Sequence, residues 1–199
     1  MTVASILGLL KPALDEGPAS SVAIGLAARI LFLAVTRKLL QRADVHVGRL
    51  RGADVRTSVL VFAVLFAHSL PEGLAIGTAY ASDTAGLSLF VILAIAIQNV
   101  PEGTSVAIPM EASGFAPAQQ FWAAVATSAP QPVGAVVAYL AVEEVSGLLP
   151  ISFAFAGGAM LALVAVELIP EALRGPRLGI SGFAAGGAVM WALSAALNV

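Results

Sequence analysis

Two short strings hold the residues of this chain best suited to chemistry. AHSLPEGLAIG contains His68 and Glu72, and AIQNVPEGTSV contains Gln98 and Glu102. In each string two metal-binding side chains stand four residues apart, a spacing that places them on one face of a helix. An imidazole nitrogen, two carboxylates and an amide oxygen together suit zinc and other first-row divalent ions. The spacing therefore predicts one metal site shared by two helices.

Both strings lie in apolar runs long enough to cross a bilayer. Of the 199 residues, 59% are hydrophobic and 11% are charged, whereas a soluble domain carries about 25% charged residues. In lipid, a segment that is not a barrel strand must pair its backbone groups within a helix. We therefore predict an all-α, polytopic transmembrane helix bundle that forms a single domain over residues 1–199. A carboxylate near the bilayer centre costs roughly 2.5–3.5 kcal/mol, and cation binding would explain why two are kept there.

The apolar runs and the basic residues together predict a topology. We expect full spans at roughly 19–38, 57–81, 86–110, 117–142 and 149–173, and a further span at 178–199. Segment 2–14 is too short for a hydrocarbon core of about 30 Å. Basic residues crowd the connection 39–56, which predicts a cytoplasmic loop, and alternation then places the C-terminus outside. The predicted location is the cell membrane, as a multi-pass protein.

A proline precedes each glutamate of the two strings. Pro71 and Pro101 cannot donate backbone hydrogen bonds, and a glycine follows each glutamate. Locally opened helices at membrane depth line a cavity or a substrate path. The alternative is that each motif only bends its helix around a protonated, hydrogen-bonded glutamate. Two such motifs, each with a polar partner four residues earlier, favour the substrate path.

Four other polar residues in the apolar runs need an interpretation. Gln131 lies at a similar depth to His68, and we expect it to hydrogen-bond to a metal ligand; direct ligation and a helix–helix contact are the alternatives. We expect Arg29 to extend toward the cytoplasmic interface, with pairing to a carboxylate as the alternative. Glu167 and Glu171 are either interface residues or part of a release path for cations.

Several chemistries are disfavoured by what the sequence lacks. There is no cysteine, which excludes thiolate metal sites and cysteine nucleophiles. The HSLPE string is not the HExxH pattern of zinc proteases. We interpret the other histidine, His46, as a surface residue of the basic loop. No glycine-rich phosphate loop is present, so ATP-driven pumping by this chain is not expected. We do not expect an enzyme.

The strings HSLPEG, QNVPEG, SAPQPVGA and VELIPEA resemble, in that order, four successive helices of the ZIP family of divalent metal transporters, with the prokaryotic branch most similar. The paired Pro-Glu-Gly motifs are the specific part of this resemblance. It implies a 3+2+3 arrangement of eight helices with both ends outside. Measured against that arrangement, this chain is expected to lack the first helix and part of the second.

The resemblance also implies roles for individual residues. The principal metal site would comprise His68, Glu72, Gln98 and Glu102, with Met1 at a position that carries a methionine near the site in some members. A second, adjacent site would involve the positions of Ser69, Asn99 and Gln131. Those three side chains carry no charge here, so one strong site is expected rather than two. Glu167 and Glu171 match the exit side.

The function implied is membrane transport of divalent cations toward the cytoplasm by alternating access. Zn²⁺ is the first expected substrate, and Fe²⁺, Mn²⁺ and Cd²⁺ are the others. The alternative is a non-transporting metal-binding or sensor paralogue, degenerate or truncated. The expected partners are the metal ion and the lipid bilayer, with no nucleic acid; the sequence leaves a homodimer open.

Overall fold

The computed structural model describes residues 2–42, 53–145, 147–165 and 169–199. Within these ranges every regular element is a helix, as predicted. The elements are α1 Thr2–Ser5, the π-helical turn η1 Ile6–Leu10, α2 Lys11–Asp15, α3 Ala19–Arg42, α4 Ala53–Ala81, α5 Leu87–Ala112, α6 Pro117–Thr127, α7 Pro130–Glu144, α8 Leu148–Leu163, α9 Ile169–Arg174 and α10 Pro176–Leu197.

Five segments are long and apolar enough to cross a membrane, which supports a multi-pass membrane protein. They are Ala19–Thr36, Thr57–Ala81, Leu87–Ala112, Pro117–Glu144 and Gly179–Leu197. The expected terminal span is therefore confirmed. The expected span at 149–173 is described only in part: α8 covers Leu148–Leu163 and α9 covers Ile169–Arg174, and residues 166–168 between them lie outside the described residues.

The prolines act differently in the three central segments. Pro71 and Pro101 lie inside the continuous helices α4 and α5. The segment that opens is the next one, where α6 stops at Thr127 and Pro130 starts α7. Proline suits a first helical position, since its missing N–H has no helical partner there. The opened backbone therefore lies directly before Gln131.

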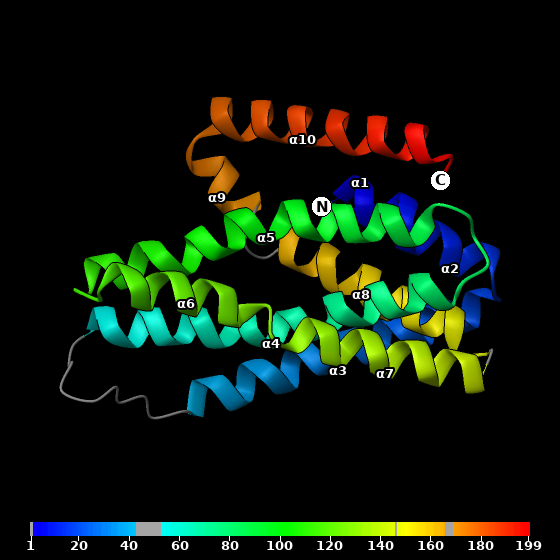
Figure 1. The fold of residues 1–199 in the computed structure, drawn as a ribbon, viewed down its shortest axis with the longest axis horizontal. Coiled ribbons are helices and arrows are strands. Elements are labelled where there is room, and N and C mark those ends of the chain that lie inside the picture. Colours follow the sequence, from blue (N-terminus) through cyan, green and yellow to red (C-terminus); the bar gives the residue numbers. More distant parts are fainter. Residues whose placement is uncertain (1, 43–52, 146, 166–168) are drawn as a thin grey trace.

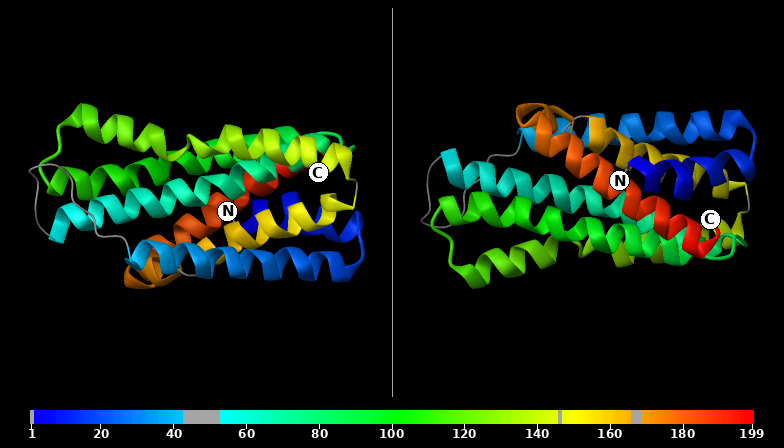
Figure 2. Two further views of the ribbon diagram at one scale, coloured as in Figure 1. Left: turned by 90° about the horizontal axis from the view of Figure 1, so that it is seen from below. Right: turned by 90° about the horizontal axis from the view of Figure 1, so that it is seen from above.

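The long helices run side by side along the long axis of the molecule (Figure 1). α4 is central: it packs against α5, α7 and α8, while α3 packs mainly against α8. The two views in Figure 2 show α10 crossing the other helices diagonally. Every helix that carries a predicted ligand thus adjoins α4 or is α4 itself.

α4 and α7 approach each other at backbone distance. A Cβ atom on Gly73 would collide with the carbonyl of Gln131, and one on Gly77 would collide with the carbonyl of Ala135. Only glycine lets the two backbones come this close. Because Gly73 follows Glu72 in the chain, this contact places the start of α7 next to Glu72.

Two apolar clusters lie on either side of the polar residues of α4 and α5. The larger one includes Ala75 and Ala79 of α4 with Phe90 and Ile95 of α5. The smaller one joins Leu65 of α4 to the far end of α5, at Val106 and Met110. Residues 68–72 and 98–102 therefore lie between two packed apolar layers, at a distance from both ends of their helices.

Candidate metal site

Two buried glutamates face each other across α4 and α5. Glu72 is 1% exposed and Glu102 is 9% exposed. The side-chain amide of Gln98 joins them: its Nε2 donates to Glu72 Oε1, and to Glu102 Oε1 at 2.6 Å. The predicted pairing of the two motifs is therefore present at three of the four positions. Two carboxylates held together in an apolar layer are an arrangement that a divalent cation would neutralise.

A second pair of amides extends this cluster toward α7. Gln131 Nε2 donates to Glu72 Oε2 at 2.8 Å and to Asn99 Oδ1 at 3.0 Å. Asn99 returns a bond from Nδ2 to Gln131 Oε1 at 3.2 Å. Gln131 thus hydrogen-bonds a predicted ligand, which is the role expected for it. Ser69 is buried in α4 but takes part in none of these bonds.

His68 faces a different neighbour from Glu72. It is 7% exposed, and its Nε2 lies 3.3 Å from Nη2 of Arg29 on α3. The ring is also hydrogen-bonded to the backbone of Ala159 on α8. A guanidinium can only donate, so Nε2 must be the acceptor and the ring proton belongs on Nδ1. The backbone bond to Ala159 fits that tautomer and orients the ring.

The expectation that Arg29 extends toward the interface is wrong. Its side chain is 1% exposed and is turned inward to His68. Its guanidinium carbon lies 5.2 Å from the ring centroid of Phe32, one turn further along α3. The physical reason is that α3 packs along α8 beside α4, which offers the guanidinium a polar partner at depth. Sequence reasoning missed this contact because no periodicity on α3 identifies its neighbour.

For four residues named from the sequence, the structure describes no side chain. Met1 and Glu167 lie outside the described residues. Glu171 belongs to α9 by its backbone, but its side chain is also outside what the structure describes. His46 of the basic connection is outside it as well.

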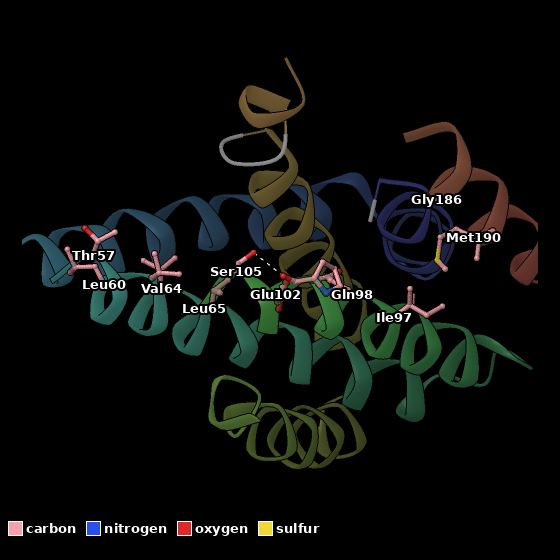
Figure 3. A pocket seen from close by; sticks show the side chains of 14 residues that line it. Thr57, Leu60, Val64, Leu65, Ile97, Gln98, Glu102, Ser105, Gly186 and Met190 are labelled. Carbon is pink, nitrogen blue, oxygen red and sulfur yellow. Dashed lines mark hydrogen bonds between the residues drawn. The ribbon is translucent and has the colours of Figure 1, made fainter. Parts of the chain in front are cut away.

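A cavity of about 620 Å³ reaches Glu102 and Gln98 from one side. It runs between α4, α5 and α10, and Gln98, Glu102 and Ser105 supply polar groups within a mostly apolar lining. Figure 3 shows Gln98 and Glu102 near the middle of this cavity, with Thr57 at one end and Met190 toward the other. The cluster is thus open to one side while the apolar layers close it along the helices.

The polar side chains form a hydrogen-bonded cluster rather than a set of converging ligands. Among the described residues, no three His, Asp or Glu side chains converge as a ready-made metal group. Amide and guanidinium donors hold the carboxylates and the imidazole, while the buried Oε1 of Gln98 has no partner within the described part. A half-turn of that amide would exchange Nε2 for Oε1 and present an oxygen to a cation.

Comparison with known proteins agrees with this geometry. Residues 36–194 match the model of a family described as ZIP zinc transporter. The chain belongs to the ZIP zinc transporter family. The match covers α4, α5 and α7, which supply the carboxylate–amide cluster. The family is one of transporters, not of enzymes.

The relatives include one plant protein and two bacterial proteins. A protein of Arabidopsis thaliana is 33% identical over 175 residues, which are 86% of this chain and 28% of that protein. Zinc transporter GufA of Myxococcus xanthus is 38% identical over 165 residues, or 80% of this chain and 65% of that protein. Zinc transporter ZIPB of Bordetella bronchiseptica is 33% identical over 148 residues, or 73% and 48%. The chain spans less than two thirds of each of these relatives.

Proposed function

We propose that this chain carries a divalent cation, with Zn²⁺ as the first substrate, across the membrane through the site at His68, Glu72, Gln98 and Glu102. The observation that carries the proposal is the pair of buried glutamates joined by Gln98 at the middle of two apolar helices. Membership of the ZIP family and two relatives titled zinc transporters support it. Within the family, the two bacterial relatives favour placement in the prokaryotic branch.

The residues of the site suggest how an ion would be held and released. The two carboxylates would balance the ion's double charge, and Gln98 Oε1 and His68 Nε2 would complete a mixed oxygen and nitrogen set. Oxygen and nitrogen donors without thiolates suit a site that must release its ion. On release, the amides of Gln98 and Gln131 would again donate hydrogen bonds to the carboxylates. The buried charge of these carboxylates would therefore stay hydrogen-bonded in the empty carrier. We propose Fe²⁺, Mn²⁺ and Cd²⁺ as further substrates for the same donor set.

The direction proposed is toward the cytoplasm, by alternating access. The basic residues between α3 and α4 support a cytoplasmic position for that connection and an outside C-terminus. The cavity reaches from Glu102 to Thr57, near the start of α4, which would make this end the release side. This route replaces Glu167 and Glu171 as the best-supported exit path, although both remain candidates for its final part.

The proposed orientation can be tested because the chain contains no cysteine. Ala85 in the α4–α5 connection and Ala112 at the end of α5 are both exposed and would lie on opposite sides of the membrane. In intact cells, an impermeant maleimide should label Ala85→Cys at once and Ala112→Cys only after permeabilisation. Labelling in the reverse pattern would invert the topology and the transport direction.

Transport itself is tested with the purified chain in proteoliposomes that enclose a zinc-sensitive dye. We expect saturable zinc uptake, absent from protein-free liposomes, together with zinc binding by the same preparation in calorimetry. Binding without uptake would favour the alternative function that the sequence analysis left open, a non-transporting metal-binding or sensor paralogue. Absence of both would contradict the metal site altogether.

A further inference from the structure

Arg29 is a buried cation with few partners. Of the arginine and lysine residues whose burial the structure describes, it alone is buried. Its Nη2 contacts His68, while its Nε and Nη1 have no hydrogen-bond partner among the described residues. The charge of Glu72 acts on it electrostatically. A charge removed from water is retained only where opposite charge or a function compensates its cost.

The contact to His68 uses the lone pair that a metal would need. Since Arg29 only donates, it takes up the free electron pair of Nε2, and the ring has a further hydrogen bond to the backbone of Ala159. Imidazole binds a metal through the nitrogen that carries no proton. His68 therefore cannot bind a metal through Nε2 and accept the hydrogen bond from Arg29 at the same time.

Charge balance gives the same exclusion independently. Without a bound cation, the guanidinium is a positive charge that acts on Glu72. A divalent ion would balance Glu72 and Glu102 by itself and would leave the guanidinium without a counter-charge. At a low effective dielectric, repulsion between a bound Zn²⁺ and Arg29 is strong over several ångströms.

We propose that Arg29 is an internal competitor of the transported cation. In the empty carrier its guanidinium holds His68 Nε2 and offsets the charge of Glu72, and the arriving metal displaces it. This inference rests on the proposed function, because it assigns Arg29 to the same site. Competition weakens binding and speeds release, so Arg29 sets the affinity at a level that permits turnover. The ring of Phe32, 5.2 Å from the guanidinium, offers the displaced cation a favourable face.

Arg29→Met tests the competition by calorimetry and uptake. The change removes the charge and the guanidinium but keeps an unbranched side chain. We expect zinc to bind about tenfold or more tightly, and uptake to show a lower KM with a lower maximal rate, since release becomes slower. Arg29→Lys keeps the charge and should stay near the parent. Lys38→Met, an exposed cation on the same helix, is the matched control and should change neither value.

The possible outcomes distinguish the competitor role of Arg29 from the proposed transport function. If the parent chain binds and transports zinc while Arg29→Met binds equally or more weakly, the competitor role is overturned and the transport function stands. If the parent binds no zinc, the proposed function fails and the role of Arg29 falls with it. A lower maximal rate without tighter binding would indicate a purely structural role and would also overturn the inference.

A measurement on the site without altering it guards against misfolding of the variants. The chain has only two histidines, so His46→Gln leaves His68 as the sole imidazole. In bilayers, solid-state NMR of ¹⁵N-labelled histidine and arginine should show a through-space contact from His68 Nε2 to a guanidinium without metal. Saturating zinc should abolish that contact. Its persistence in the zinc-loaded chain would contradict displacement.

Discussion

Glu72→Gln is expected to reduce zinc uptake in proteoliposomes to near background and to weaken zinc binding roughly 150- to 4,000-fold. Removing one partner of a buried charge pair costs about 3–5 kcal/mol, which corresponds to that range of affinity. Glu72 accepts hydrogen bonds from both Gln98 and Gln131, so it joins both halves of the cluster. Calorimetry and dye-reported uptake on one preparation measure the two effects together.

The fold should survive this change. Glutamine has the shape of glutamate and keeps an oxygen that can accept from Gln131, so the variant should remain monodisperse and melt near the parent temperature. Glu143→Gln is the matched control: this glutamate is exposed at the end of α7 and bonds only to Tyr139 among the described contacts. It should bind and transport zinc like the parent. If Glu72→Gln did the same, the site would be misassigned.

Gln131→Glu is expected to change the number of zinc ions bound per chain from one to two. The amide of Gln131 now lies 2.8 Å from Glu72 Oε2 and is paired with Asn99. A carboxylate there would add the missing charge at the position where the resemblance implies a second ion. Without metal, the new carboxylate would repel Glu72, so the metal-free chain should melt at a lower temperature.

Zinc should then stabilise this variant more than the parent. A ligand that binds only the folded state contributes about 2.7 kcal/mol at a concentration 100 times its Kd, and two ions contribute separately. Elemental analysis after gel filtration gives the stoichiometry, and thermal unfolding with and without zinc gives the stabilisation. Gln119→Glu, at an exposed position on α6, is the control and should leave one ion per chain. One ion bound to Gln131→Glu would show that Asn99 and Ser69 cannot complete a second site.

Much of the cluster was predictable because it depends on helical spacing. Four-residue separation placed Gln98 and Glu102 on one face of α5, and their hydrogen bond confirms it. The depth of the two motifs in apolar runs predicted their burial, and all four proposed ligands are less than 10% exposed. The short connection between the two runs predicted adjacent helices, which α4 and α5 are.

The neighbours across helix interfaces were not predictable from spacing. Helical periodicity fixes the direction of a side chain around its own axis, but not which helix it meets. His68 and Glu72 share a face of α4, yet one contacts Arg29 on α3 and the other contacts Gln98 on α5 and Gln131 on α7. Arg29 was expected to leave the bundle because nothing in the sequence of α3 reveals a polar partner at depth.

The sequence by itself determined the composition of the site: helices long enough to span a bilayer, and two carboxylates held at their centre with amides beside them. Only the tertiary structure decided how these groups are paired. The close approach at Gly73, the helix break before Pro130 and the packing of α3 on α8 bring Gln131 and Arg29 to the ligands. The physical reason is that burial and helix formation depend on local sequence, whereas contacts between helices depend on which backbones can approach and which polar groups must be satisfied together.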